Sequence, residues 1–177
     1  MENKMNAIDY PRKKWFNQVG KDLTDEIFDG ETYTTTQRRI DKIVVHCSAS
    51  PQGRGDGARE IDRWHTEKGW DGIGYHYVVL ENGDIQKGRW IDKAGAHAKG
   101  YNGNTIGIVR IGGWKGNHDT TMEQKFALMA LCELLRDEYD LETSDIVGHK
   151  ELPSVAKECP CMDMDKFREL VDSQSML

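Results

Sequence analysis

The alternation of short strand-like runs with longer amphipathic stretches most constrains how this chain folds. A compact β-branched run at residues 43–46 has the composition of a buried strand. Strands are predicted at residues 43–46, 75–80, 85–89, 105–111 and 145–148, and helices at residues 58–68, 122–139 and 163–171. Strands that alternate with helices and include one hairpin favour an α/β fold with a central mixed β-sheet flanked by helices.

The clearest turn signal is the pair Asn82-Gly83, which lies between two strand-like runs. Asn-Gly is preferred in tight hairpin turns because both residues tolerate positive φ. The pair therefore predicts a hairpin between residues 75–80 and 85–89, with a tight turn at its tip.

The first forty residues differ from the rest of the chain because they show no sustained hydrophobic period. We therefore divide the 177 residues into an N-terminal appendage of unknown role, residues 1–39, and one folded domain, residues 40–177. The appendage either packs on the domain or binds a protein partner. A monomer is the default expectation.

Composition and charge exclude several classes of function. The formal net charge is −6 and the chain has no basic stripe, which argues against nucleic-acid binding. No apolar run approaches the roughly 20 residues of a membrane helix, so no membrane span is expected. Residues 1–6 have no apolar core behind their charges, unlike a secretory signal. We expect the protein to stay in the cytoplasm until it is released.

The chain has four cysteines, and without a signal peptide they are expected to be reduced. Cys132 lies within a helical pattern and is expected in the core. Cys47 follows His46 on a predicted strand, so its side chain faces the opposite side of the sheet and is a poor ligand beside it. Cys159 and Cys161 lie in a loop, and Cys159 is the preferred ligand because it directly precedes Pro160.

Three residues form a candidate zinc site. His46 and His149 stand at the ends of strand-like runs, and Cys159 lies in the Pro-flanked loop. Three protein ligands leave the fourth tetrahedral position open, as a catalytic zinc requires. A lone histidine is more often a polar surface residue or a satisfied core residue, so the spacing by itself leaves the metal role open.

Two further residues have the chemistry that zinc-dependent amide hydrolysis needs beside the metal. Such a reaction requires an activated water, a group that stabilises the oxyanion, and a proton donor. Lys157 lies two residues before Cys159, and Tyr75 opens a predicted strand. From the residues alone, Tyr75 could equally pack for shape and Lys157 could be a solvated charge.

Several short motifs occur in an order that is specific as a set. They are Val45–Ser50, Arg59–His65, Gly69–Tyr77, His97–Asn102, Ile106–Ile108 and Lys157–Pro160. Together these motifs closely resemble the type 2 N-acetylmuramoyl-L-alanine amidases, in particular the lysozymes of T-odd coliphages, over about residues 40–170. Peptidoglycan recognition proteins share the fold of this family.

The resemblance implies a role for each candidate residue. It matches His46, His149 and Cys159 to the Zn²⁺ ligands, Tyr75 and Lys157 to the catalytic tyrosine and lysine, and His97 to a loop that borders the substrate groove. The implied enzyme is a zinc-dependent peptidoglycan hydrolase that cuts the amide between N-acetylmuramic acid and L-alanine of the stem peptide. Without a signal peptide, it resembles a phage or prophage endolysin that is released at lysis and acts on the cell wall.

Two other functions fit the same fold. One is a non-catalytic peptidoglycan-binding module, and the other is a regulator whose residues 1–39 bind a partner. Binding-only relatives of this fold typically lose the metal cysteine, and this chain has Cys159 at that position. The complete set of ligands and catalytic residues therefore favours the enzyme.

One departure from the family concerns Arg110, which falls in the predicted central strand, where relatives carry an apolar or small residue. Its side chain is either paired in the groove or disturbs the strand locally. Three further histidines are not assigned to the site. His65 and His76 are expected to be structural, and His118 is expected in an exposed loop.

Overall fold

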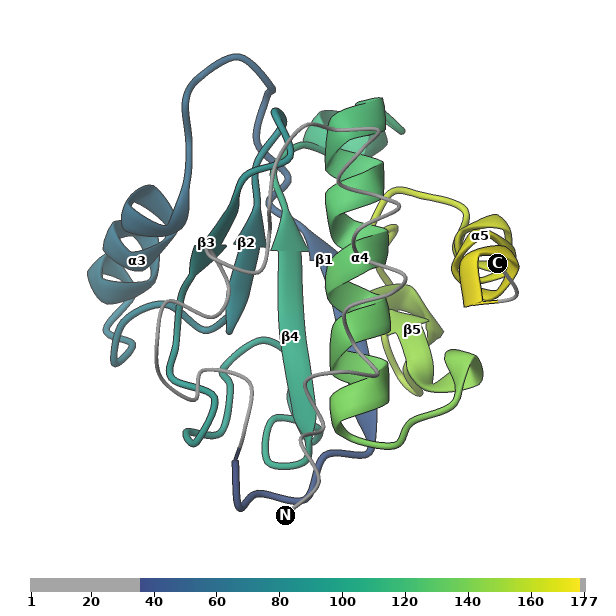
Figure 1. Ribbon diagram of the computed structural model, residues 1–177. Helices are drawn as coiled ribbons and strands as arrows, with labels where there is room; N and C mark the ends of the chain where they lie inside the picture. The colour runs from purple at the N-terminus through teal and green to yellow at the C-terminus, as the bar shows by residue number, and fades with distance from the viewer. Residues whose placement is uncertain (1–35, 176–177) are drawn as a thin grey trace.

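The computed structural model describes residues 36–175, and a five-stranded sheet with the order β3-β2-β4-β1-β5 lies at its centre (Figure 1). The strands are β1 (Lys42–Cys47), β2 (Tyr77–Val79), β3 (Ile85–Lys87), β4 (Thr105–Arg110) and β5 (Ile146–Gly148). Strands β2, β4, β1 and β5 run parallel, whereas β3 pairs antiparallel with β2. The predicted mixed sheet is confirmed.

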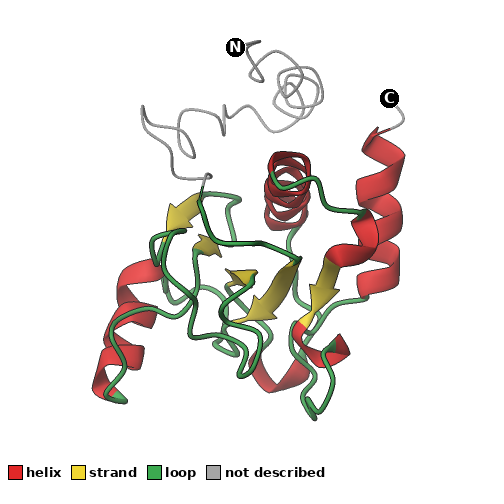
Figure 2. Ribbon diagram, turned by 90° about the horizontal axis from the view of Figure 1, so that it is seen from below, coloured by secondary structure: helices red, strands yellow, loops and turns green. Residues whose placement is uncertain are grey.

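Helices cover both faces of the sheet (Figure 2). Helix α3 (Ala58–Glu67) packs on one face, and α4 (Met122–Glu138) with α5 (Met164–Ser175) packs on the other. Short 3-10 turns cover Trp114–Gly116, Thr143–Asp145 and His149–Glu151. No helix within residues 36–175 is long and apolar enough to cross a membrane.

The two-residue period of β1 decides which side chains reach each face. Ile43 and Val45 belong to the larger core beneath α4 and α5, which also contains Leu128 and Phe167. Val44 points to the opposite side, as the alternation requires. His46 follows the same alternation, so it lies on the face that α4 leaves uncovered, near the carboxyl end of the strand.

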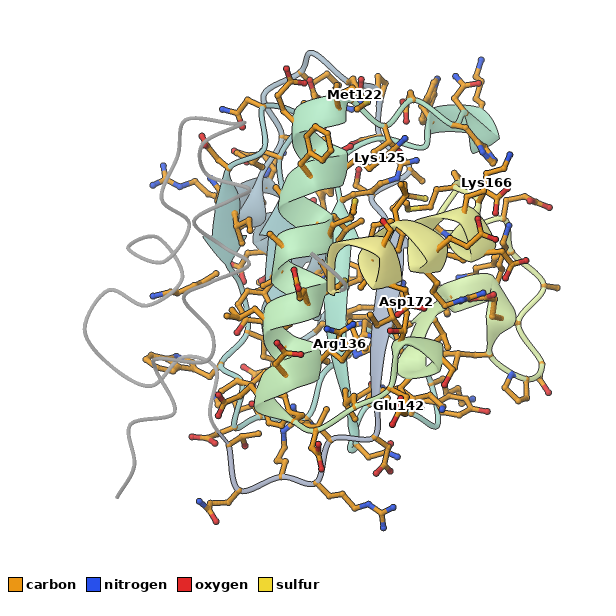
Figure 3. The ribbon with its side chains drawn as sticks, turned by 45° about the vertical axis from the view of Figure 1, so that its right-hand side comes forward. Met122, Lys125, Arg136, Glu142, Lys166 and Asp172 are labelled. Carbon is orange, nitrogen blue, oxygen red and sulfur yellow. The ribbon has the colours of Figure 1, made fainter. Side chains whose placement is uncertain are left out.

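Charged side chains such as Lys125, Arg136, Lys166 and Asp172 lie on the outer surfaces of α4 and α5, where Met122 is also exposed (Figure 3). Arg136 of α4 and Asp172 of α5 approach to 4.0 Å, and Arg136 also donates a 3.1 Å hydrogen bond to Thr143. These contacts join the two helices on the side of the sheet away from His46.

The predicted hairpin between β2 and β3 is present, but its loop has three residues. The Leu80 N–H donates to the Asp84 carbonyl at 2.8 Å, and the Gly83 N–H donates to the Leu80 carbonyl at 3.0 Å. Gly83 has a φ of 87°, whereas Asn82 stays outside the positive-φ region. This geometry is a type I turn followed by a left-handed glycine. The expected turn, in which both Asn82 and Gly83 would have positive φ, is not formed.

Residues 1–35 of the proposed appendage lie outside the described residues. Arg38, near its end, contacts the domain: Nε donates to the Ile91 carbonyl at 2.8 Å and Nη1 donates to the Gly103 carbonyl at 2.9 Å. The Arg38 side chain therefore links the loop that contains Ile91 to the loop that contains Gly103.

Candidate active site

The site forms where neighbouring parallel strands end. His46 is the penultimate residue of β1, and His149 follows β5 directly. Strands β1 and β5 are paired with Val45 opposite Gly148, so the two histidines emerge side by side. Cys159 arrives on a loop that is held by a 2.8 Å hydrogen bond from the Lys150 N–H to the Cys159 carbonyl. The carboxyl edge of a parallel sheet is where such folds place their ligand sites.

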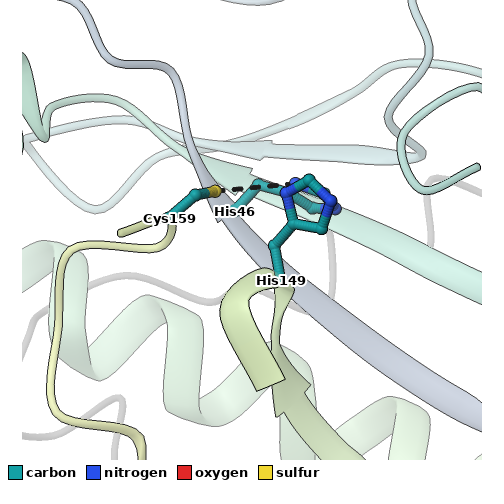
Figure 4. Close-up of side chains that lie close together, drawn as sticks. All are labelled: His46, His149 and Cys159. Carbon is teal, nitrogen blue, oxygen red and sulfur yellow. Dashed lines mark hydrogen bonds between the residues drawn. The ribbon is translucent and has the colours of Figure 1, made fainter. Parts of the chain in front are cut away.

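The structure brings the three predicted ligands together (Figure 4). One donor atom from each of His46, His149 and Cys159 lies within 4.8 Å of the others. His46 Nδ1 lies 3.7 Å from Cys159 Sγ, and the two imidazole centroids are 4.4 Å apart. Tetrahedral zinc with ordinary bond lengths would separate a nitrogen and a sulfur ligand by about 3.6 Å, so the donor set fits this ion.

The neighbouring cysteines do not join this cluster. Cys47 Sγ lies 3.5 Å from Cys161 Sγ, on the side of β1 opposite His46, as the strand alternation predicted. The Cys47 N–H instead donates to Cys159 Sγ at 3.2 Å. Among the described residues, the group that can hold a metal contains Cys159 and not Cys161.

The protonation states of the cluster suit metal binding. Burial lowers the pKa of His46 well below its ordinary value, and burial also lowers that of His149. Hydrogen bonding with Cys47 lowers the pKa of the Cys159 thiol. A neutral imidazole and a thiolate are the forms in which these residues bind metal.

Tyr75 lies beside the cluster, two residues before β2. Its ring centroid is 5.0 Å from that of His46 and 5.5 Å from that of His65. His65 Nδ1 accepts a 2.9 Å hydrogen bond from the Gly74 N–H, which fixes the backbone next to Tyr75. Burial raises the pKa of Tyr75 above its usual range, so the phenol keeps its proton.

Lys157 is an exposed residue on the same loop as Cys159 and lines the cleft beside the cluster. Its positive charge contributes to the lowered pKa values of His46 and His149. The positive charge of Lys157 therefore lies close enough to the predicted metal ligands to affect their protonation.

A cleft of about 640 Å³ contains all six predicted site residues: His46, Tyr75, His97, His149, Lys157 and Cys159. Its wall includes Lys68, Trp70 and Lys115, to which the sequence had assigned no role. Trp70 is 43% exposed, and Lys68 Nζ lies 5.9 Å from its ring centroid. Trp70 falls within the motif Gly69–Tyr77, whereas nothing in the local sequence distinguishes Lys68 or Lys115 from ordinary surface side chains.

The remaining histidines occupy different surroundings. His76 is buried, accepts from the Gly107 N–H at Nδ1 and reaches the Lys93 carbonyl with Nε2, which agrees with the expected structural role. His65 braces Gly74 but also lines the cleft. His118 is exposed, as expected. His97 Nδ1 lies 3.0 Å from His46 Nε2, and burial lowers the pKa of His97 to about 3.

Arg110 is paired inside the protein and does not line the cleft. Its side chain is fully buried and forms a 3.0 Å ion pair with Asp119. It also donates hydrogen bonds to the carbonyl groups of Pro160 and Cys161. These partners explain how the central strand accommodates a charge, and Arg110 does not disturb the pairing of β4 with β1.

The cleft combines two imidazoles, a thiol, a phenol and an ammonium group. These are the functional groups that a metal-dependent hydrolase needs. The N-acetylmuramoyl-L-alanine amidase family model matches residues 36–162. The endolysin of Escherichia phage T7 is 38% identical over 133 residues, which cover 73% of this chain and 85% of the relative. The chain therefore belongs to the N-acetylmuramoyl-L-alanine amidase family.

Solved structures agree with this family assignment. The amidase LysC from Clostridium intestinale has a TM-score of 0.66 and 27% sequence identity, with 80% of this chain and 89% of that chain covered. Drosophila PGRP-LB shares the fold with a TM-score of 0.60 and 24% identity, over 77% of this chain and 85% of that chain. The predicted fold, family and enzyme class are confirmed.

Proposed function

We propose that the protein is a zinc-dependent endolysin. Its reaction is hydrolysis of the amide between the lactyl group of N-acetylmuramic acid and L-alanine of the peptidoglycan stem peptide. One observation carries the zinc assignment: donor atoms of His46, His149 and Cys159 converge within 4.8 Å in a cleft that also holds Tyr75 and Lys157. The T7 relative is named an endolysin, which supports the same biological role.

In this proposal His46, His149 and Cys159 would hold the ion at the wall of the cleft. Bound there, Zn²⁺ supplies a Lewis acid and lowers the pKa of a bound water to roughly 7. The thiolate offsets part of the ion's charge, and the neutral imidazoles supply lone pairs without competing protons.

Lys157 and Tyr75 act on the scissile amide. The Lys157 ammonium stabilises the negative charge that develops on the carbonyl oxygen as the tetrahedral intermediate forms. Tyr75, a protonated phenol at neutral pH, donates or relays a proton to the departing amine or orients the attacking water. His97 borders the substrate from the opposite loop.

The proposed partner is a muropeptide of the cell wall. The cleft is large enough for a short peptide with its sugar anchor, because ligand sites of this kind span about 300–1,000 Å³. We further propose that the enzyme is monomeric, stays in the cytoplasm until lysis and then acts on the wall. We also propose a protein partner for residues 1–39.

Mass spectrometry of purified sacculi tests the activity. Wild-type protein with zinc is expected to release free stem peptides that begin with L-alanine, whereas Cys159→Ala and chelator-treated protein release none. Cys132→Ala is the matched control, since Cys132 is a core residue of α4 and lies outside the cleft. Sugar-cleavage products from the wild type would contradict the amidase assignment.

The alternatives give different results in the same assay. A binding module would sediment with sacculi without releasing peptides, and equal binding by Cys159→Ala would accompany that result. A regulatory role for the appendage predicts that deletion of residues 1–35 changes release only when a partner is present. If the protein without residues 1–35 releases peptides as the wild type does, alone and in lysate, the amidase domain is sufficient for peptide release.

A further inference from the structure

His46 uses its two ring nitrogens in different directions. Nδ1 lies 3.7 Å from Cys159 Sγ, within the proposed metal site. Nε2 lies 3.0 Å from Nδ1 of His97, on the loop before β4. Neutral imidazole carries one ring proton, so one of these nitrogens donates and the other accepts. Which nitrogen holds the proton decides whether His46 can bind a metal through Nδ1.

The next contact of His97 settles the direction of these hydrogen bonds. His97 Nε2 lies 3.2 Å from the hydroxyl oxygen of Thr105, the first residue of β4. The Thr105 hydroxyl donates its only hydrogen to the Tyr101 carbonyl at 2.8 Å. Thr105 Oγ1 can therefore only accept from His97, which requires the proton of a neutral His97 to be on Nε2.

We propose that Thr105 and His97 are positioning residues that hold His46 in the Nε2–H tautomer. With its proton on Nε2, His97 offers the Nδ1 lone pair to the Nε2–H of His46. The Nδ1 lone pair of His46 is then free and directed toward Cys159, where the ion would bind. The inference rests on the proposed function in one respect, because it takes His46 to be a metal ligand.

The His97 ring lies in a slot made by two glycines. A Cβ atom on Gly107 of β4 would come within 2.5 Å of the ring, and one on Gly95 within 2.4 Å. Asn102 Oδ1 accepts from the backbone N–H groups of His97 and Ala98 at 2.8 and 2.9 Å, which fixes the backbone of the loop around His97. The two adjacent glycines leave room for the ring, and the fixed backbone favours the orientation in which His97 reaches both partners.

Partners of this kind tune metal affinity in a measurable way. A histidine ligand commonly donates its second ring N–H to a neighbouring acceptor, and loss of that acceptor typically weakens metal binding 10- to 100-fold. Here the acceptor is an imidazole whose own tautomer is set by a buried hydroxyl group. The expected effect therefore passes through two hydrogen bonds, and each can be broken separately.

Nitrogen-15 NMR of the zinc-free full-length protein tests the tautomers directly. His46 and His97 are both expected to show a protonated Nε2 and an unprotonated Nδ1 near neutral pH. A protonated Nδ1 on His46 would overturn the proposed tautomer. The measurement needs no metal, so it tests the tautomers even if the wild type binds no zinc. Failure of the wild type to bind zinc would instead overturn the zinc assignment in the proposed function.

Zinc titration against a competing chelator tests the consequence for affinity, with two matched pairs of variants. His97→Leu removes the acceptor and is expected to weaken zinc binding 10- to 100-fold, whereas His97→Asn restores an acceptor near Nδ1 and recovers much of the loss. Thr105→Val removes only the hydroxyl and is expected to weaken binding about 10-fold, whereas Thr105→Ser stays near the wild-type value.

Circular dichroism of each variant establishes that it is folded before titration. Wild-type affinity in folded His97→Leu would overturn the proposal, as would equal losses in Thr105→Val and Thr105→Ser. A serine variant that keeps affinity where the valine variant loses it assigns the effect to the hydroxyl group and not to packing.

Discussion

Arg110 Nε donates a 3.1 Å hydrogen bond to the carbonyl oxygen of Pro160, the residue that follows the proposed ligand Cys159. The same guanidinium donates to the Cys161 carbonyl at 2.9 Å and pairs with Asp119 at 3.0 Å. The central strand thus holds the loop that carries the sulfur ligand. A buried charge is tolerated here because each of the three guanidinium nitrogens donates to an acceptor.

Arg110→Met is expected to destabilise the protein by about 3–5 kcal/mol, because it leaves the Pro160 and Cys161 carbonyls and the Asp119 carboxylate without their buried partner. The loosened loop should also bind zinc more weakly. Urea denaturation with zinc and with chelator measures both effects. Asp119→Asn is the milder control, since the Asp119 side chain is 25% exposed and Arg110 keeps its carbonyl partners. A loss of unfolding free energy below about 1 kcal/mol in Arg110→Met would contradict the role of Arg110 in holding the Cys159 loop.

Tyr75→Phe is expected to lower kcat by about 10²–10⁴-fold while the zinc affinity stays at the wild-type value. The reason is that Tyr75 lies beside the cluster and is not one of the three proposed ligands, and its phenol is protonated at neutral pH. Kinetics on a soluble muropeptide, with zinc content measured on the same samples, separate the two effects. Loss of zinc in Tyr75→Phe would instead indicate a structural role.

Lys157→Met is expected to reduce kcat by about 10²–10³-fold, because the charge that stabilises the oxyanion is removed while the aliphatic stem remains. Lys150→Met is a matched control on the neighbouring turn, since Lys150 is absent from the cleft wall. Equal activity of the two variants would show that Lys157 is one more solvated charge. Retained zinc in Lys157→Met, measured by atomic absorption, excludes a lost site as the cause.

The fold could be predicted because it rests on short-range patterns, whereas the three proposed ligands were matched through the family resemblance, since their spacing alone left the metal role open. Period-two and helical spacing predicted the strands and helices, and His46 and His149 could be placed at strand ends where parallel strands finish together. The alternation on β1 also separated His46 from Cys47 correctly. The roles of Tyr75 and Lys157 remain predictions.

The rest could not be predicted because it depends on contacts between distant segments. Thr105 reads as an ordinary strand residue, and only the tertiary position of the loop before β4 shows that its hydroxyl meets His97. Asp119, the partner of Arg110, lies in a loop with no sequence signal. Likewise Asn82-Gly83 fits two kinds of hairpin turn, and the dipeptide alone does not distinguish them.

His76 makes stability depend on pH. Burial lowers its pKa from 6.5 to about 4, and its Nδ1 accepts from the Gly107 N–H, so protonation would remove an acceptor inside the protein. Between those values the unfolded chain binds the extra proton and the folded protein does not. The stabilisation is therefore complete above pH 6.5 and is lost progressively toward pH 4, by up to about 3 kcal/mol from this group.

Urea denaturation at pH 7.5, 5.5 and 4.5 measures that dependence, and NMR titration of the His76 ring assigns it. His76→Gln is expected to be less stable at pH 7.5 but to lose less stability on acidification. His118→Gln, which changes an exposed residue, should keep the wild-type slope. A His76 ring that titrates near pH 6.5 would refute the assignment.

Gly107→Ala is expected to cost about 1–3 kcal/mol and to weaken zinc binding, because its Cβ would lie 2.5 Å from the His97 ring and force the ring from His46. Gly103→Ala is the control, since a Cβ there meets nothing within 4 Å. In the His97→Ala background the obstructing ring is gone, so Gly107→Ala should cost much less. A double-mutant cycle of unfolding free energies measures this coupling, and strictly additive effects would show that Gly107 is required for a reason other than the His97 slot.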